Sequence, residues 1–232
     1  MLTELVSADT VLIPSVGPAY GMMMDQAAVL KDTSFPTVMV LPTTAVATQD
    51  GVMAGLRRFV ERVNRPAVLY LKDEPYLTAR RAATLVEEGL VSFIKYAIVR
   101  ENPAEDSFLS ELVELVGRDL ICSGLGEQPA AVHMNTFGCV GFTSGCVCIN
   151  PALSQRLLHD IQRADDASIQ KVQSQFRPLE DLRNRINPIR VLHEAVTAAG
   201  IAETGPPLPL MSALDPTSGG LVAEAAQNLK AL

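Results

Sequence analysis

Short apolar segments alternate with amphipathic ones through the first 150 residues. Six segments are short, apolar, rich in β-branched residues and contain or border Gly or Pro, which is typical of buried strands. They are 10–17, 35–42, 66–71, 92–98, 119–124 and 139–145. Helical periodicity fills the intervals 51–64, 78–89, 107–117 and 129–138. Because strand and helix alternate along the chain, we expect βαβ units and a parallel sheet.

Two closed architectures fit this alternation, a doubly wound open sheet and a (β/α)8 barrel. The glycine pair in "GLG" at 124–126 lacks the third glycine and the downstream acid of a dinucleotide site, so the barrel fits better. Only six strands are predicted, however. The opening stretch 1–9 resembles the end of a helix, so we expect the chain to begin partway round a barrel.

Beyond residue 150 the pattern is purely helical. The helical segments are 150–165, 167–186, 188–200 and 219–231. They have no strands between them, so they form an appended bundle and do not supply the missing barrel units. The predicted domains are therefore a partial TIM barrel at 1–150 and a C-terminal helical extension at 151–232.

Composition narrows the function classes. Hydrophobic residues make up 48% of the 232 residues and charged ones 19%, a globular composition with a net charge of −7. The bases are scattered, which argues against a nucleic-acid partner. No apolar run is long enough to span a membrane, and "MLTELVSADT" lacks the features of a signal peptide. Four cysteines in a chain of this size predict free thiols and a cytoplasmic location. The Cys146–Cys148 pair has no second pair, so no metal is expected.

One lysine stands inside an apolar strand. Lys95 lies in "LVSFIKYAIV", residues 90–99, where a charged ammonium is costly unless it is paired or deprotonated. Burial lowers the pKa of an amine toward neutrality, and a neutral amine can attack a carbonyl. A lysine paired with an acid such as Glu74 or Glu127 is the structural alternative.

Several motifs together resemble a known family. "VLYLKDEP", then "VSFIKYAIV", "LICSGLGE" and "GCVGFTSGCVCINP" resemble, in order and spacing, the dihydrodipicolinate synthase and N-acetylneuraminate lyase family. The resemblance extends to "NPIRVLHEAVTAAGI". It implies a (β/α)8 barrel with a helical extension, a Schiff-base lysine at Lys95 and a proton-relaying tyrosine at Tyr70.

The chain also departs from that family. It lacks the first two strands with the Gly-Thr-Thr-Gly-Glu motif that binds the substrate carboxylate. The segment after Tyr70 reads "LKDEPYLT", without the arginine that grips a distal carboxylate in the synthase branch. A sugar-acid dehydratase or aldolase is therefore easier to accommodate than the lysine-biosynthetic synthase.

Loop residues after the predicted strands complete the candidate site. Lys72 is the nearest base for the far end of a substrate. Gly124 follows one strand, and Thr143, Ser144 and Gly145 follow the next; such loops often bind anions through backbone N–H groups. Tight turns that require glycine explain the same residues equally well.

These features predict a Schiff-base lyase acting on a 2-oxo acid or deoxy sugar acid. No cofactor is needed, because the lysine imine is itself the electron sink. The resemblance implies a homo-oligomer, a dimer or tetramer. A catalytically impaired relative that binds a ligand is the alternative, and a third is that the natural protein begins about 65 residues earlier, as expected for a full barrel of roughly 250 residues.

Overall fold

The computed structural model describes residues 5–7 and 9–232. Of the opening stretch in which the end of a helix is predicted, residues 1–4 and 8 lie outside the described residues, and the described ones are not helical.

The described chain forms two compact units. One contains the residues up to Gly124 together with Phe137–Val140, and the other contains Leu125–Thr136 and Gly141–Leu232. We call them the strand unit and the helical unit. The domain boundary at residue 150 stays a prediction.

All six predicted strands are present, each shorter than its apolar segment. They are β1 (Ser15–Val16), β2 (Val38–Val40), β3 (Ala67–Leu71), β4 (Val91–Tyr96), β5 (Ile121–Ser123) and β6 (Gly141–Phe142). The sheet order follows the sequence from β1 to β6, and the four pairs from β1 to β5 are parallel. Sequential parallel order with a helix between strands is the barrel pattern, so the predicted incomplete barrel is confirmed.

Helices follow the strands as expected, with one addition. In the strand unit they are α1 (Tyr20–Leu30), α2 (Gln49–Val63), α3 (Ala79–Glu87), α4 (Ser107–Val116) and the short 3-10 helix η2 (Arg118–Leu120). Helix α1 is absent from the predicted set. Its apolar residues are not confined to one face, since Met23 and Ala27 are buried but Met22 and Val29 are exposed.

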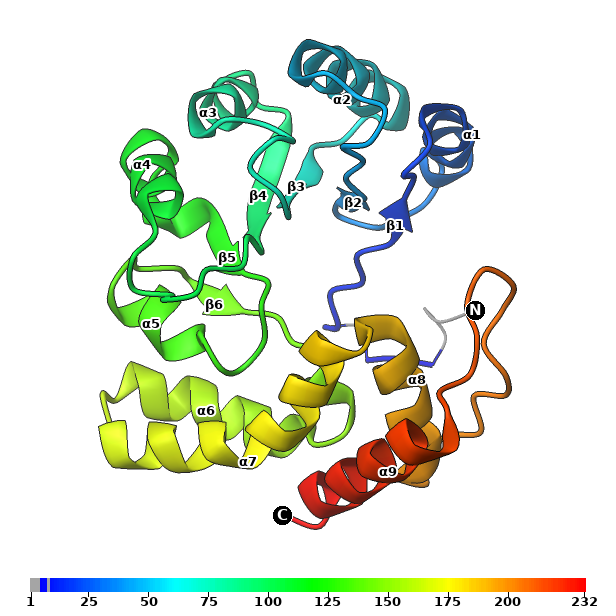
Figure 1. Ribbon diagram of the computed structural model, residues 1–232. Helices are drawn as coiled ribbons and strands as arrows, with labels where there is room; N and C mark the ends of the chain where they lie inside the picture. Colours follow the sequence, from blue (N-terminus) through cyan, green and yellow to red (C-terminus); the bar gives the residue numbers. More distant parts are fainter. Residues whose placement is uncertain (1–4, 8) are drawn as a thin grey trace. The chain divides into compact units, whose positions relative to one another are not determined.

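Helices α1 to α4 lie along the outer side of β1–β5 (Figure 1). Helix α2 shows why this layer forms. Its buried positions Leu56, Phe59, Val60 and Val63 recur at helical spacing on one face. The Thr48 side chain caps its N-terminus, and burial of the apolar stripe against the sheet supplies most of its stability.

The N-terminus of α4 is capped by Asp106, one residue before the predicted helix. The Asp106 side chain accepts the N–H of Leu109 at 3.0 Å. A carboxylate suits this position because the exposed N–H groups of a helix start favour negative charge.

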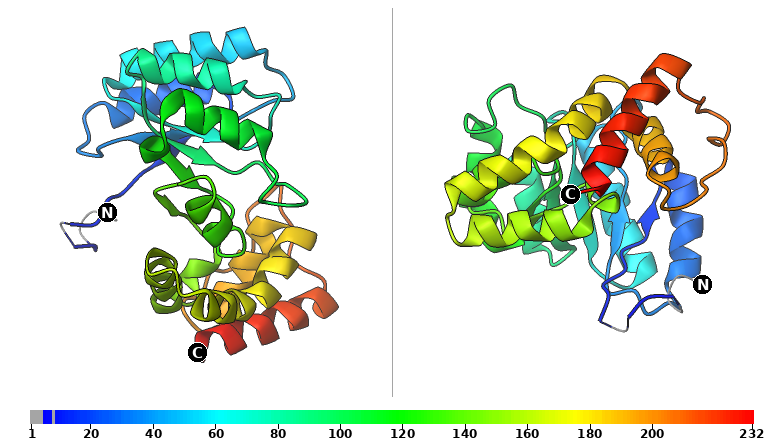
Figure 2. Two further views of the ribbon diagram at one scale, coloured as in Figure 1. Left: turned by 90° about the vertical axis from the view of Figure 1, so that its left-hand side faces the viewer. Right: turned by 90° about the horizontal axis from the view of Figure 1, so that it is seen from below.

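The helical unit has its own apolar core. Its helices are α5 (Ala130–Asn135), the 3-10 helix η3 (Cys146–Cys148), α6 (Pro151–Gln162), α7 (Asp166–Arg185), α8 (Pro188–Ala198) and α9 (Pro216–Lys230). Leu157, Val172, Phe176 and Val222 are among its fully buried residues. Helices α6 and α7 pack together, as do α8 and α9 (Figure 2), so the predicted C-terminal bundle is confirmed.

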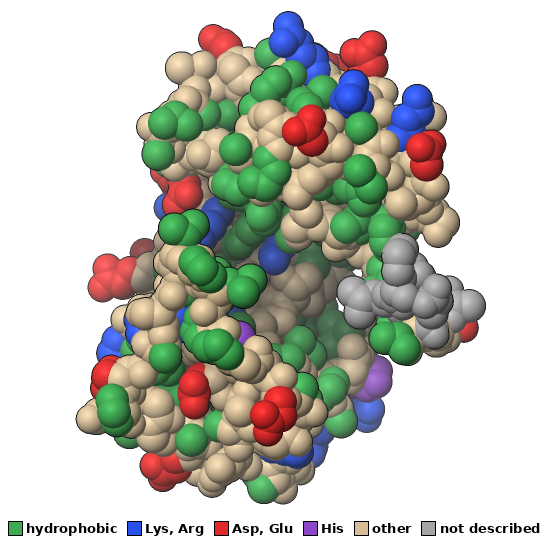
Figure 3. Space-filling model, turned by 90° about the vertical axis from the view of Figure 1, so that its right-hand side faces the viewer, with side chains coloured by type: hydrophobic (Ala, Val, Ile, Leu, Met, Phe, Trp, Pro, Cys, Tyr) green, Lys and Arg blue, Asp and Glu red, His purple; other side chains and the backbone are tan. Residues whose placement is uncertain are grey.

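On the face shown in Figure 3, acidic and basic side chains are interspersed. None of the helices in the described part of the chain is both long and apolar enough to cross a membrane.

Candidate functional site

Lys95 and Tyr70 occupy neighbouring strands at the same level. The register of β3 and β4 pairs Tyr70 with Lys95, and the Lys95 Nζ lies 4.6 Å from the centroid of the Tyr70 ring. On β4 the neighbouring residue, Tyr96, packs its ring on Phe108 of α4, with 6.2 Å between centroids. Because side chains alternate along a strand, Lys95 lies on the inner face, opposite the helices.

Gly124 gives the Lys95 side chain its space. A Cβ atom on Gly124 would lie 2.9 Å from both Cγ and Cε of Lys95 and 3.1 Å from the Cβ of Ala97. Real Cβ atoms essentially never show distances as short as 2.9 Å, so the lysine stem would have to shift. Glycine at this position is therefore required by the packing of the lysine stem, whereas its predicted contact with substrate stays a prediction.

Cys122 extends the row across a third strand. The register of β4 and β5 pairs it with Lys95. Burial raises the pKa of the Cys122 thiol to about 11, against the opposing effect of the Lys95 charge. The thiol is therefore neutral at physiological pH, and the inner face presents a tyrosine, a lysine and a thiol side by side.

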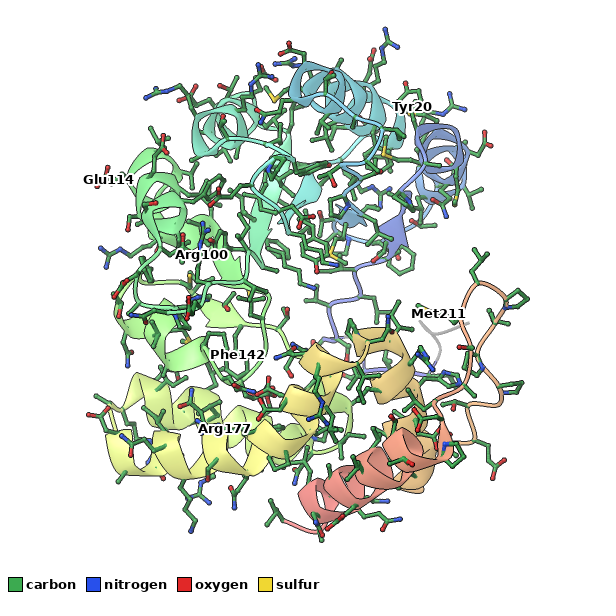
Figure 4. The ribbon with its side chains drawn as sticks, viewed as in Figure 1. Tyr20, Arg100, Glu114, Phe142, Arg177 and Met211 are labelled. Atoms are coloured by element: carbon green, nitrogen blue, oxygen red, sulfur yellow. The ribbon has the colours of Figure 1, made fainter. Side chains whose placement is uncertain are left out.

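A buried ionic network lies beyond Lys95 along the chain. The fully buried Tyr96 donates its hydroxyl proton to Asp106, and Arg100 donates to Asp106 at 3.0 Å and also to Glu74. Figure 4 shows Arg100 in the segment between β4 and α4. Glu74, one of the two acids considered as a partner of Lys95, is thus paired with Arg100.

The pKa shifts in this network follow from its contacts. Burial raises the pKa of Tyr96, and the hydrogen bond to Asp106 raises it further. Burial also acts to raise the pKa of Asp106, but hydrogen bonds from Arg100, Tyr96 and the Leu109 N–H outweigh it and hold that pKa below its usual value. Asp106 is therefore a carboxylate, and the network fixes the segment that follows the strand of Lys95.

Lys72, the predicted contact for the far end of a substrate, is exposed one residue after β3. The predicted binding residues Thr143, Ser144 and Gly145 belong to the helical unit. Thr143 accepts the Gly126 N–H at 3.1 Å through its carbonyl, and Ser144 donates its hydroxyl proton to Glu127. A Cβ on Gly145 would lie 2.4 Å from the Leu192 side chain. Local packing thus accounts for this glycine as well, and the predicted substrate contacts stay predictions.

Glu127, the other acid considered as a partner of Lys95, lies beside Glu180, for which the sequence predicts no role. Glu127 is fully buried, and so, on α7, is Glu180. The Glu180 Oε1 accepts the Glu127 N–H at 2.9 Å. Glu180 lies four residues after the buried Phe176, on the apolar face of α7, but helical spacing does not say what a residue contacts, so only the tertiary structure reveals the pair.

All four cysteines are free thiols. The described residues contain no cluster of three or more His, Cys, Asp or Glu side chains arranged to hold a metal ion.

Comparison with known proteins leaves the sequence unmatched but identifies the fold. No protein-family model matches the chain, and no curated protein sequence matches it.

Solved structures match over nearly the whole chain. The dihydrodipicolinate synthase from Oceanobacillus iheyensis is 23% identical with a TM-score of 0.84, over 100% of this chain and 77% of that one. The dihydrodipicolinate synthase from Bacillus clausii is also 23% identical, with a TM-score of 0.83 over 97% and 76% of the two chains. YagE, an E. coli K12 prophage protein of the dihydrodipicolinic acid synthase family solved with pyruvate, is 16% identical with a TM-score of 0.80 over 99% and 78%. The chain therefore has the fold of this family of structures, as the sequence resemblance implies, and is shorter than they are.

Proposed function

We propose that this protein is a lyase that forms an imine between Lys95 and the carbonyl carbon of a 2-oxo acid or deoxy sugar acid. The amine attacks the carbonyl, water leaves, and the resulting C=N bond accepts electrons when a neighbouring C–C or C–O bond breaks. Tyr70 relays the protons, and Lys72, Gly124 and the segment 143–145 contact the substrate. No cofactor takes part in this scheme, because the imine is the electron sink.

The observation that carries the proposal is the row of Tyr70 and Lys95 across β3 and β4. An ionisable phenol and an amine occupy the same face of a barrel sheet, with the amine 4.6 Å from the ring centroid. Gly124 leaves room for the lysine stem that a Cβ would take. Proton transfer needs the phenol oxygen within hydrogen-bond reach of the reacting atoms, directly or through one water, and the register places the two side chains at the same level of the sheet for it. The fold shared with a family structure solved with pyruvate supports a small 2-oxo acid as the first ligand to test.

A second candidate is a ligand-binding relative without full chemistry. The face of an aromatic ring attracts a cation, so the contact of the Lys95 Nζ with Tyr70 favours the ammonium form, which is not nucleophilic. A protein of this kind would bind a 2-oxo acid through its charge and form no covalent bond.

Borohydride trapping with pyruvate separates the two candidates. Borohydride reduces an imine to a stable secondary amine, so we expect a mass increase on the peptide that carries Lys95, read by intact and peptide mass spectrometry. The adduct should be absent in Lys95→Ala and retained in Lys171→Ala, which removes an exposed lysine of α7. Gly124→Ala should lower the trapped fraction because its Cβ displaces the lysine stem.

Circular dichroism of each variant shows whether it is folded. A folded wild-type protein without an adduct would refute the lyase and leave the ligand-binding candidate. An adduct that persists undiminished in Lys95→Ala would refute the role of Lys95. The cytoplasmic location and the dimer or tetramer remain predictions beside this proposal.

A further inference from the structure

In the helical unit, the buried glutamates Glu127 and Glu180 form hydrogen bonds with the segments that follow β5 and β6. The Ser144 hydroxyl donates to one carboxylate oxygen of Glu127, and the Ser154 hydroxyl donates to the other at 2.9 Å. The Cys146 N–H in turn donates to the Ser144 oxygen at 3.0 Å. The Ser144 hydroxyl is thus oriented by Glu127, and the 143–146 segment takes its conformation from a buried carboxylate.

Glu180 completes the arrangement from α7. Its Oε1 accepts the Glu127 N–H at 2.9 Å, whereas its Oε2 is buried and accepts no hydrogen bond from any described group. A Cβ on Gly126 would lie 2.2 Å from Oε1, and the φ of Gly126 is +97°, so glycine is what allows Glu180 to approach. A proton on Oε2 would make it a donor and would remove the repulsion from the Glu127 charge, which acts on Glu180.

The groups that face the pair cannot neutralise two negative charges. On α7, Arg183 is the cation that acts on Glu180, and it also donates to the Leu125 carbonyl at 3.2 Å. On η3, Cys146 and Cys148 have raised pKa values, chiefly because of burial. On α6, Ser154 is neutral. Burial and the Glu127 charge together raise the pKa of Glu180 to about 8.

We propose that Glu127 and Glu180 are positioning residues for substrate binding: with the proton on Glu180, the pair holds Thr143, Ser144 and Gly145 in the conformation that contacts the substrate. The inference rests on the proposed function, in which that segment touches the substrate. While Glu180 is protonated, Glu127 keeps its hydrogen bond from the Ser144 hydroxyl. When the proton leaves, two buried carboxylates repel each other and the segment is released, so binding weakens at alkaline pH.

Hydrogen exchange tests whether the glutamate pair controls the segment 143–146, without any assay of activity. Exchange of the backbone N–H groups of residues 143–146 is followed by mass spectrometry from pH 6 to 9 and corrected for the intrinsic effect of pH. We expect several-fold faster exchange above about pH 8 in the wild-type protein. Glu180→Gln carries a neutral donor at every pH and should exchange slowly throughout. Glu224→Gln, which changes an exposed acid of α9, should behave as the wild type.

The concentration of pyruvate that half-saturates borohydride trapping gives the second readout. We expect it to rise several-fold between pH 7 and 9 in the wild type and in Glu224→Gln, and markedly less in Glu180→Gln, with the maximal trapped fraction unchanged. Because the titration of Lys95 is common to all three proteins, the difference between their profiles isolates the glutamate pair.

The outcomes of the two experiments are distinguishable. A wild-type protein that forms no adduct refutes the proposed function, while the exchange experiment still decides whether the pair controls the segment. If Glu180→Gln is folded by circular dichroism yet follows the wild-type exchange profile, the proposal is wrong. It is equally wrong if exchange changes as expected but the pyruvate profiles of the three proteins coincide.

Discussion

The strand unit and the helical unit each bury carboxylates, and they neutralise them in opposite ways. In the strand unit, Asp106 receives hydrogen bonds from the cation Arg100, from Tyr96 and from the first turn of α4. In the helical unit, Glu180 faces a second carboxylate, Glu127, and its Oε2 has no hydrogen-bond partner among the described residues.

The difference shows that the partner, and not burial alone, decides the charge of a buried acid. Burial acts to raise the pKa of both groups, yet that of Asp106 lies below its usual value and that of Glu180 above it. A cation and several donors outweigh desolvation, whereas a like charge adds to it. Asp106 therefore functions as an ion and Glu180 as a holder of a proton.

Removing the Asp106 carboxylate should have the largest effect on stability. Asp106→Ala takes the acceptor from Tyr96, Arg100 and the cap of α4 together. We expect a loss of about 3 kcal/mol in the free energy of unfolding, at the low end for a broken buried pair because Arg100 keeps Glu74. Urea unfolding followed by circular dichroism measures it. Glu105→Ala, which removes an exposed neighbour, is the control. A loss below about 1 kcal/mol would show that the network adds little beyond the cap.

The proton of Glu180 should produce a smaller effect that depends on pH. Between its unfolded pKa of 4.5 and its folded pKa of about 8, the folded protein binds a proton that the unfolded chain has released. Stability from this group is therefore fully present below pH 4.5 and is lost as pH rises toward 8, with a fall on the order of 2 kcal/mol between pH 6 and pH 8. The urea midpoint, measured at several pH values, should show this fall in wild type and not in Glu180→Gln.

Asp106 contributes with the opposite sign. Because its folded pKa is depressed, the stability it adds is present above its unfolded pKa of 3.8 and is lost as pH falls below it. Asp106→Asn should therefore flatten only the acid side of the profile. If Glu180→Gln and Asp106→Asn change the dependence of unfolding free energy on pH in the same way, the two buried acids do not contribute with opposite signs.

An exposed ion pair should give the smallest effect and shows how much burial matters. Arg57 on α2 forms a bidentate hydrogen-bonded pair with Glu88, and solvent reaches both side chains. Arg57→Ala should leave the urea midpoint within the error of the wild-type value, because water and salt screen such pairs. A shift of the urea midpoint comparable with that of Asp106→Ala would mean that burial does not make the Asp106 network more stabilising than an exposed ion pair.

The sequence by itself determined the order of the secondary structure. The apolar segments predicted all six strands and their parallel order, because a buried strand needs a continuous apolar run whatever its neighbours are. The helical extension followed from periodicity in the same way. Helix α1 was missed because its apolar residues surround the helix and give no one-sided pattern. The position of Lys95 and Tyr70 on adjacent strands followed from the alternation of strand and helix, and their register agrees with it.

Only the tertiary structure decided what the polar residues contact. From the sequence, Gly124 and Gly145 indicate either a tight turn or a contact with a ligand. In the structure, the space that a Cβ atom would take is occupied by the side chain of Lys95 at Gly124 and of Leu192 at Gly145. Glu127 and Glu180 are 53 residues apart in the chain, and no local pattern predicts that they meet. Periodicity reports which face of an element is apolar, but the charge of a buried acid depends on the distance to groups brought near it by folding. That distance is a property of the packed chain and is not encoded in any short stretch of it.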